Sequence, residues 1–361
     1  MHKIFDQYSF GKCIKSIEPF GHGHINKTYL LITKKNEKYI LQRINHNVFK
    51  KPKEVMENIE LVTEYIRHQI KNGGNNPSQL ALEIIPTLTG HSYAKVDDFY
   101  WRCYRYVYGA RTYEVIENDE MFYEVGKAVG LFQKQLQNFP INKLHITIPD
   151  FHNTPARFKK FLEAIYGDNK TVDLDTFNDI KFVFERKDIM GTIIDLLEKG
   201  KIPLRVTHND TKLNNIMIDE RTHKAICVID LDTVMPGSVL YDFGDAIRIG
   251  ASTAIEDEPD LKKIKVDLNL FEKFSQGFLE ETHQILNKVE ISHLVESARI
   301  ITLECGMRFL TDYFNGNVYF NIDYPHHNLI RARAQFKLVE EIEANSSSLN
   351  DIIKKIIKSL N

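Results

Sequence analysis

The fold is decided by three neighbouring stretches, Val206-Thr-His-Asn-Asp-Thr-Lys-Leu-Asn-Asn-Ile-Met-Ile-Asp219, Ala225-Ile-Cys-Val-Ile-Asp-Leu-Asp-Thr-Val234 and Tyr241-Asp-Phe-Gly-Asp245. Two apolar runs, 216–218 and 225–229, flank a polar stretch. Short apolar runs on either side of a polar segment are typical of a β-hairpin. The sequence therefore predicts a hairpin with a loose turn near residues 221–222.

This hairpin would bring three oxygen-bearing side chains together. Antiparallel pairing sets Asn215 opposite a residue between 228 and 230, so Asn215 and Asp230 meet at the open end of the hairpin. Asp210 lies five residues before Asn215, in the loop that leads into the first strand. Amide and carboxylate oxygens suit Mg²⁺, and a free carboxylate can take a proton from an attacking hydroxyl. Together these residue types predict phosphoryl transfer.

Each of these residues also has a simpler interpretation on its own. Asp210 would cap a turn, Asn215 would end a loop, and Asp230 and Asp232 would end a strand at a solvated edge. The combination of His-x-Asp-x4-Asn, a hairpin, Ile-Asp-x-Asp and Tyr-Asp-Phe-Gly-Asp favours a functional site.

This combination resembles the aminoglycoside phosphotransferase and choline kinase superfamily. The resemblance implies an α+β, bilobal, protein-kinase-like fold that uses ATP and Mg²⁺. Residues 1–108 would form a small antiparallel-sheet lobe that binds the nucleotide, and residues 109–361 a mostly helical lobe for catalysis and substrate binding. Within the superfamily, the sequence of residues 208–248 is similar to that of the N-acetylhexosamine 1-kinases.

The resemblance also implies a role for each polar residue of the central stretch. The catalytic residues would be Asp210, which accepts the hydroxyl proton, and His208, which stabilises the loop. Asn215 and Asp230 would hold Mg²⁺, with Asp232 as a further ligand or an orienting group. Asp242 would accept hydrogen bonds that fix the catalytic loop.

Strands are expected at 14–20, 28–32 and 39–44, where apolar and polar residues alternate. Gly21 and Gly23 lie in the first connection, where missing side chains let backbone N–H groups approach a phosphate. A plain hairpin turn fits Gly-x-Gly equally well. We assign these glycines, with Asn26 from the same connection, to the nucleotide site.

In the kinase-like fold the third strand usually supplies a Lys to the phosphates. Here that strand offers Gln42 and Arg43, which point to opposite faces, and Lys38 stands only at its beginning. The fork of Arg43 suits phosphate oxygens, but the sequence leaves open which neighbour faces the nucleotide. Glu57, on a helix expected at 54–71, is the candidate carboxylate partner, although such glutamates more often form a solvated face.

Further strands are expected at 82–85, 91–96 and 99–107, the last rich in aromatic residues and stopped by Gly109. The resemblance implies that the backbone near Tyr106 and Tyr108 binds adenine. The aromatic cluster taken alone indicates only a core.

The remaining chain reads as mostly helical because apolar residues recur at helical spacing. Helices are expected at 121–139, 156–165, 182–197, 268–281, 291–315 and 330–345.

A late segment, 305–320, is a candidate for acceptor binding. Arg308 and Asp312 lie at i and i+4 before a glycine-containing turn, which on sequence alone indicates a helical ion pair. By resemblance this region lines a sugar site, so Arg308 and Asp312 would hold sugar oxygens and Tyr319 would stack on the sugar's apolar face.

Composition limits the class of protein. The 361 residues are 43% hydrophobic and 27% charged, and the formal net charge is −2. This net charge indicates binding to neither nucleic acid nor an anionic membrane. The four cysteines are widely spaced, so neither zinc nor a disulfide framework is expected. The first residues lack the apolar core of a signal peptide, and we expect a cytoplasmic protein.

The favoured acceptor is the anomeric hydroxyl of N-acetylglucosamine or N-acetylgalactosamine. Within the same fold the alternative is a kinase of choline, homoserine, a thiosugar or an aminoglycoside. Choline would require an acidic or aromatic cage and an aminoglycoside an acidic cleft, which Arg308 disfavours if it lines the acceptor site. A non-catalytic nucleotide-binding scaffold and a metal-dependent phosphohydrolase are the remaining alternatives.

Overall fold

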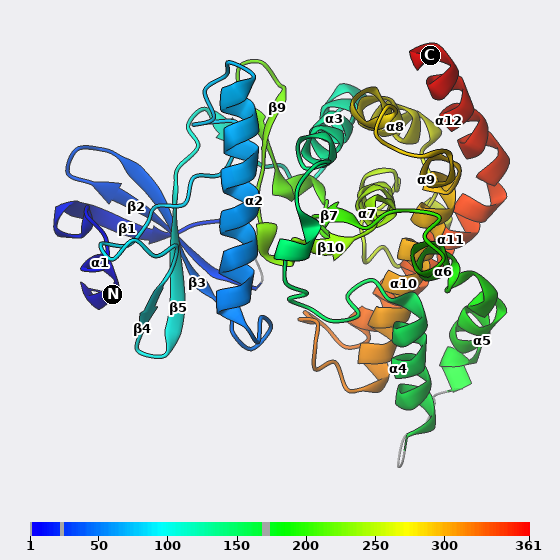
Figure 1. Ribbon diagram of the computed structural model, residues 1–361. Helices are drawn as coiled ribbons and strands as arrows, with labels where there is room; N and C mark the ends of the chain where they lie inside the picture. Colours follow the sequence, from blue (N-terminus) through cyan, green and yellow to red (C-terminus); the bar gives the residue numbers. More distant parts are fainter. Residues whose placement is uncertain (1, 22–24, 168–173) are drawn as a thin grey trace. The chain divides into compact units, whose positions relative to one another are not determined.

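The computed structural model describes residues 2–21, 25–167 and 174–361, and these divide into two compact units (Figure 1). The first unit comprises residues 1–111, 138–148 and 217–236, and the second comprises 112–137, 149–216 and 237–361. The chain first passes from one unit to the other after residue 111, and the predicted lobes 1–108 and 109–361 stay a prediction. Two later segments also pack with the first unit, a feature that a single boundary does not express.

The first unit contains a five-stranded antiparallel sheet in the order β1-β2-β3-β5-β4. Its strands are β1 (Ile14–Pro19), β2 (Lys27–Thr33), β3 (Lys38–Ile44), β4 (Ala94–Val96) and β5 (Phe99–Arg105). The strands expected at 14–20, 28–32, 39–44 and 99–107 are thereby confirmed. The strand expected at 82–85 is wrong, because Ile84 forms only an isolated bridge to Tyr104. The strand expected at 91–96 is shorter than predicted.

The two faces of this sheet differ in chemistry because side chains alternate along each strand. Leu31, Leu41 and Cys103 are buried on one face together with Ile4 and Phe10 from the start of the chain. The register pairs Thr28 with Gln42 and Gln42 with Arg102, so these polar side chains share the opposite face.

The long helix α2 (Pro52–Asn72) runs beside the sheet and joins the separate segments of the first unit (Figure 1). Pro52 begins the helix, where its missing N–H costs nothing. Asn58 is fully buried and donates to the backbone oxygens of His145 (2.8 Å) and Val234 (2.9 Å). One side chain therefore ties residues 138–148 and 217–236 to the helix.

The predicted hairpin is confirmed as β8 (Ile216–Asp219) and β9 (Ala225–Val228), which are neighbours in a three-stranded sheet with β6 (Ala110–Arg111). The Asp219 amide donates to the carbonyl of Lys224 (2.9 Å), so the turn is centred near residues 221–222 as expected. The Asp219 side chain accepts from the amides of Arg221 and Thr222 and stabilises the turn.

The remaining short elements of the first unit are α1 (His2–Phe5) and three 3-10 helices, Gly11–Cys13, Ile141–Lys143 and Leu231–Thr233. The strand β10 (Met235–Gly237) follows the last of these.

The second unit is mostly helical. Its helices are α3 (Asp119–Gln135), α4 (Thr154–Tyr166), α5 (Phe177–Glu185), α6 (Thr192–Glu198), α7 (Val239–Gly250), α8 (Leu268–Thr282), α9 (Lys288–Ser292), α10 (Leu294–Phe314), α11 (His327–Ala344) and α12 (Ser346–Leu360). It also holds the strand β7 (Arg205–Thr207) and 3-10 helices at Leu174–Thr176, Lys187–Ile189, Leu213–Asn215 and Leu261–Lys263.

Most of the predicted helices are confirmed, with two corrections. The helix expected at 182–197 is wrong, because α5 ends at Glu185 and α6 begins only at Thr192. The segment that carries Tyr241-Asp-Phe-Gly-Asp245 forms α7, which was not predicted. Its N-cap residue Ser238 accepts a hydrogen bond from the Leu240 amide. A serine at this position is an ordinary helix start, which the prediction overlooked beside the charged motif.

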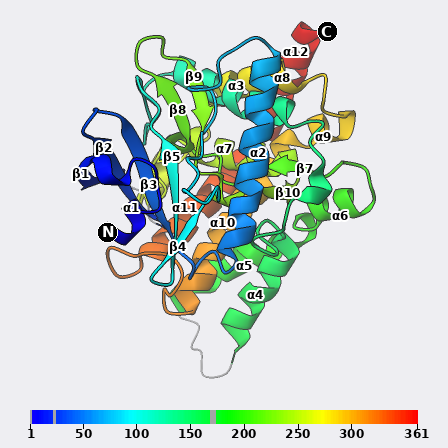
Figure 2. The same ribbon diagram turned by 60° about the vertical axis from the view of Figure 1, so that its left-hand side comes forward.

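Close helix packing in the second unit depends on glycine. A Cβ at Gly126 of α3 would lie 2.2 Å from the Phe274 carbonyl oxygen, and one at Gly277 of α8 would lie 2.2 Å from the Tyr123 carbonyl oxygen. These two helices consequently lie side by side in direct backbone contact (Figure 2). Helix α10 is buried over most of its length and packs against α4, α7 and α11.

No helix within the described residues combines the length and the apolar character that crossing a lipid bilayer requires.

Candidate active site

The loop predicted to be catalytic, called the catalytic loop below, runs in the second unit from β7 to the 3-10 helix at Leu213–Asn215, and Asp242 of α7 holds its beginning. The Asp242 carboxylate accepts from the backbone amides of His208 (3.0 Å) and Asn209 (2.7 Å) and from Gln133 Nε2 (2.7 Å). Asn209 adopts the left-handed conformation (φ 65°), which turns the chain sharply before Asp210. Burial raises the pKa of Asp242 even though these donors oppose the rise.

The loop brings Asp210 and Asn215 into direct contact. Asn215 Nδ2 donates to Asp210 Oδ2 (3.0 Å) and to the Asp210 carbonyl (2.8 Å). Lys212 Nζ lies 3.2 Å from Asp210 Oδ2, and the Asp210 side chain is 30% exposed. Burial alone would raise the pKa of Asp210, but the charges of Lys212 and His208 hold it below its usual value. Asp210 is therefore an ionised carboxylate that solvent, or a substrate, can reach.

A second carboxylate of α7 supports the same loop. The Thr211 amide donates to Asp245 Oδ2 (3.0 Å), and the Thr211 hydroxyl donates to the Asp242 carbonyl (2.6 Å). Asp245 is in turn paired with Arg248 (3.0 Å). The motif at residues 241–245 thus acts as one helical turn whose two carboxylates fix the backbone of residues 208–211.

In the first unit, Asp232 lies in a buried network on the polar face of the sheet. Its Oδ1 pairs with Arg102 of β5 and its Oδ2 accepts from Asn26, while Arg102 Nε donates to Gln42 Oε1 (2.9 Å). Arg102 and Asp232 are 1% and 3% exposed. Because both Asp232 oxygens are engaged by side chains of its own unit, Asp232 fits an orienting group better than a metal ligand.

The same network distinguishes Gln42 from Arg43. Gln42 also donates to the Thr28 hydroxyl (3.0 Å), on the face that holds Arg102. Arg43 lies on the other face with its guanidinium 4.4 Å from the centre of the Phe99 ring. Glu57, the candidate partner of Arg43, instead contacts His145 (2.6 Å). Sequence reasoning missed Arg102, since nothing in the spacing of β5 links it to residue 232.

Asp230 lies at the end of the hairpin in the left-handed conformation (φ 58°), just before the 3-10 helix at Leu231–Thr233. The donors predicted for the metal are the Asp230 carboxylate and the Asn215 amide oxygen, and this assignment stays a prediction. Both are hard oxygen donors of the kind that Mg²⁺ and Ca²⁺ prefer, so the donor chemistry fits a divalent cation. Among the residues that the structure describes, no group of three His, Cys, Asp or Glu side chains could hold a metal.

The residues assigned to nucleotide binding are described in part. Gly21 has a positive φ (74°), which suits a glycine in a tight connection, whereas Gly23 lies outside the described residues. Tyr106 packs edge-on against Tyr108, with ring centres 5.2 Å apart. The Tyr108 hydroxyl accepts from the Lys38 amide (2.9 Å). These contacts give the end of the sheet an aromatic surface, and its role in adenine binding stays a prediction.

The acceptor candidates of the second unit gather around α10. The Arg308 guanidinium lies 5.5 Å from the Phe151 ring, 6.0 Å from the Tyr319 ring and 5.6 Å from the Phe320 ring. Arg157 of α4 donates to the Phe151 carbonyl (2.9 Å). Burial, and then the charge of Arg308, lowers the pKa of Arg157. Two guanidinium groups and several rings therefore share one region, and sequence reasoning missed Arg157 and Phe151.

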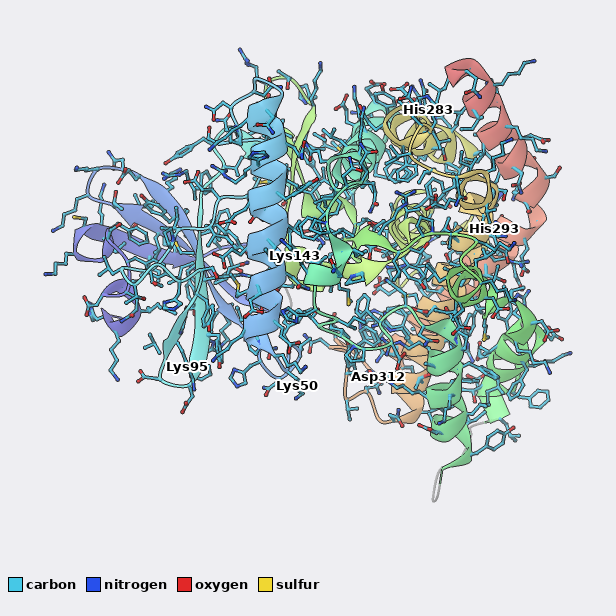
Figure 3. The ribbon with its side chains drawn as sticks, viewed as in Figure 1. Lys50, Lys95, Lys143, His283, His293 and Asp312 are labelled. Carbon is cyan, nitrogen blue, oxygen red and sulfur yellow. The ribbon has the colours of Figure 1, made fainter. Side chains whose placement is uncertain are left out.

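The helical ion pair expected between Arg308 and Asp312 is wrong. Asp312 Oδ1 accepts from the amides of Val318 (3.0 Å) and Tyr319 (2.9 Å), and Oδ2 accepts from the amide of Phe320 (2.9 Å). The buried carboxylate of Asp312, near the end of α10 (Figure 3), thus fixes the following loop. Tyr319 in that loop is 60% exposed. Asp312 therefore orders the loop, and Arg308 contacts aromatic rings and does not pair with Asp312.

A family model described as the phosphotransferase enzyme family matches residues 16–273, which is more than half of the chain. This chain belongs to the phosphotransferase enzyme family. As a member of that family it is a small-molecule phosphotransferase.

Solved structures of family-like kinases share the fold. A microcompartment-associated aminopropanol kinase is 15% identical, with 97% of each chain covered and a TM-score of 0.66. An aminoglycoside phosphotransferase from Alicyclobacillus acidocaldarius subsp. acidocaldarius DSM 446 is 14% identical, with 98% of this chain and 96% of that chain covered and a TM-score of 0.60. An amicoumacin kinase in complex with AMP-PNP and Ca²⁺ is 15% identical, with coverage of 95% and 92% and a TM-score of 0.59. The predicted fold class, an antiparallel amino-terminal sheet followed by a helical region, is confirmed.

Proposed function

We propose that this phosphotransferase transfers the γ-phosphoryl group of ATP to a sugar hydroxyl. The favoured reaction is phosphorylation of N-acetylglucosamine or N-acetylgalactosamine at the anomeric hydroxyl, which gives the 1-phosphate. The observation that carries the proposal is the ionised Asp210 carboxylate, fixed by Asn215 and bordered by Lys212 on a loop that α7 holds rigid. A carboxylate in this state can receive a proton from a hydroxyl that attacks phosphorus.

In the proposed reaction the acceptor oxygen forms a bond to the γ-phosphorus while the bond between that phosphorus and the bridging oxygen of ADP breaks. Asp210 orients the hydroxyl and takes its proton. Asn215 and Asp230 would hold a divalent cation, which, when bound, neutralises charge on the phosphates. Lys212 lies beside Asp210 and adds a positive charge where the transferred group carries negative charge.

Adenine nucleotide and a divalent cation are supported by the amicoumacin kinase, which has the same fold and was solved with AMP-PNP and Ca²⁺. The glycine connection and the aromatic end of the sheet are our candidates for the nucleotide contacts. Mg²⁺ is the expected cation because it commonly binds through one or two protein oxygens together with phosphates.

The acceptor region favours a neutral, hydroxyl-rich molecule. Within the described part of the chain Arg308 donates no hydrogen bond to the protein, so its five N–H groups are available to ligand oxygens. The exposed Tyr319 ring offers an apolar face on which a sugar ring can pack. Arg157 and Arg308 would repel a cationic acceptor.

The same arginines argue against the second candidate, a kinase of a cationic amino alcohol. This candidate is retained because the aminopropanol kinase shares the fold over nearly the whole chain. An acceptor with a quaternary or primary ammonium group would need carboxylates or an aromatic cage without a neighbouring cation.

ADP release by the purified protein, measured against a panel of acceptors, separates these candidates. The panel contains N-acetylglucosamine, N-acetylgalactosamine, the parent hexoses, a thiosugar, choline, ethanolamine, 1-amino-2-propanol, homoserine and an aminoglycoside, each with ATP and Mg²⁺. We expect turnover with an N-acetylhexosamine, and ³¹P NMR should identify a 1-phosphate.

Other outcomes would overturn the proposal in distinct ways. Turnover only with amino alcohols would establish the second candidate. Phosphate release without any acceptor would favour a phosphohydrolase, and nucleotide binding without turnover would favour a scaffold.

A further inference from the structure

His152, which lies just before α4, connects the catalytic loop to the acceptor region. Its ring is buried (8% exposed), with Nε2 3.3 Å from the Asn209 carbonyl oxygen and Nδ1 2.9 Å from Glu304 Oε1. Asn209 immediately precedes Asp210 and carries the left-handed backbone turn. A side chain that holds the Asn209 carbonyl therefore controls the direction in which the chain enters Asp210.

The partners of His152 decide which ring atoms donate. A carbonyl oxygen only accepts, so Nε2 carries a hydrogen and donates to Asn209. Glu304 Oε2 also accepts from the Thr154 hydroxyl (2.6 Å). Burial alone would raise the pKa of Glu304, but His152, and then Arg308, holds it below its usual value. The Glu304 carboxylate lies against Nδ1 and orients the ring toward Asn209.

Glu304 also borders the two acceptor arginines. It lies one turn before Arg308 on α10 and is 1% exposed. Its negative charge acts on both Arg308 and Arg157. The tilted Tyr241 ring of α7, centred 5.0 Å from the His152 ring, closes another side of the imidazole. The arginines that interact with Glu304 are Arg157 of α4 and Arg308 of α10.

We infer that His152 is a positioning residue: it holds the Asn209 carbonyl so that Asp210 keeps its orientation, and Glu304 both orients His152 and links the catalytic loop to the arginines of the acceptor region. The inference rests on the proposed function only where activity is the readout. Loop order can be measured without any substrate.

Three variants test the role of the ring. His152→Ala removes both hydrogen bonds, whereas His152→Gln keeps a side-chain N–H that can reach the Asn209 carbonyl. His283→Ala is the matched control, because the His283 ring also bonds a backbone carbonyl (Leu279, 2.9 Å) but lies at the C-terminal end of α8, away from the catalytic loop (Figure 3).

For the acceptor that the wild-type protein phosphorylates best, we expect His152→Ala to lower kcat by about 10–100-fold with the KM for ATP changed less than about twofold. His152→Gln should recover at least about tenfold of that loss, and His283→Ala should behave as wild type. Glu304→Gln should lower kcat and also raise the acceptor KM, because the charge that balances Arg308 is lost.

Hydrogen exchange of the nucleotide-free protein gives the second readout. We expect faster amide exchange in the peptide that covers residues 207–215 in His152→Ala, with α8 and α12 unchanged. An unaltered kcat in His152→Ala, no recovery in His152→Gln, or unaltered exchange at 207–215 would each overturn the inference. If no acceptor in the panel is phosphorylated, the proposed function fails, and the exchange experiment still decides the role of His152.

Discussion

Asp210 is the residue on which the proposed chemistry depends, and replacing its carboxylate isolates that role. Asp210→Asn keeps the size of the side chain and removes the proton acceptor. We expect turnover to fall by about 10²–10⁴-fold while nucleotide affinity, measured by calorimetry, is retained. Asp195→Asn serves as the control, because Asp195 is an exposed partner of Lys199. Unchanged turnover in Asp210→Asn would remove Asp210 from the mechanism.

The lowered pKa of Asp210 makes a prediction about pH. Because Lys212 and His208 hold the pKa below the ordinary value of about 3.9, Asp210 is fully ionised above about pH 5. The kcat/KM profile should therefore show no acid limb from this group between pH 5 and 8. Its contribution to folding stability is present above its unfolded pKa and is lost as the pH falls through the folded value, below about pH 4. An acid limb above pH 5 that moves in Asp210→Glu would contradict this assignment.

The strand β5 contributes the buried cation of the first unit. Removing Arg102 leaves the Asp232 charge buried without its partner, which is among the costliest changes in a protein interior. We expect Arg102→Met to lower the free energy of unfolding by about 3–5 kcal/mol, measured by urea denaturation. The double variant with Asp232→Leu should regain most of that loss, because an apolar pair replaces the ion pair. Equal instability of both variants would show that the pair does not account for the loss.

The loop after α10 depends on Asp312 in the same way that a helix end depends on its cap. Asp312→Asn would turn an NH₂ group toward backbone donors that now share a carboxylate. If the disordered loop weakens acceptor binding by about 1.4 kcal/mol, the acceptor KM should rise about tenfold. The KM for ATP should be unchanged. Asp323→Asn, on an exposed side chain of the same loop, should have no effect. A change in the KM for ATP instead would argue against a role of this loop in acceptor binding.

For the whole molecule, the proposed function includes a metal site formed by Asn215 and Asp230. If both bind the same cation, Asn215→Ala and Asp230→Ala should each lower the affinity for Mg·ATP. The affinity of the double variant should then be close to that of the single variant with the lower affinity. Calorimetric titration of the three variants measures this. Additive losses, or normal Mg·ATP affinity in Asp230→Ala, would show that the two residues do not share an ion.

Local features of this protein could be read from the sequence. The hairpin β8–β9, the contact of Asp210 with Asn215 and four strands of the sheet follow from residue spacing, because their hydrogen bonds join residues close in the chain or obey a strict alternation. The helix α7 was not predicted because its charged motif hides an ordinary helical start. The single helix predicted at 182–197 is wrong because one apolar pattern runs through two short helices, α5 and α6.

The contacts between distant residues were decided only by the tertiary structure. Arg102 meets Asp232 across 130 positions, and His152 meets Glu304 across 152. No spacing rule links such pairs, since they form where the folded chain leaves a buried charge that must be neutralised. The sequence by itself thus determined which polar residues lie together in the predicted catalytic loop, because they are neighbours along the chain. Folding determined which buried side chains hold Asp232 and the Asn209 carbonyl in place, because burial and charge pairing arise only when remote segments pack together.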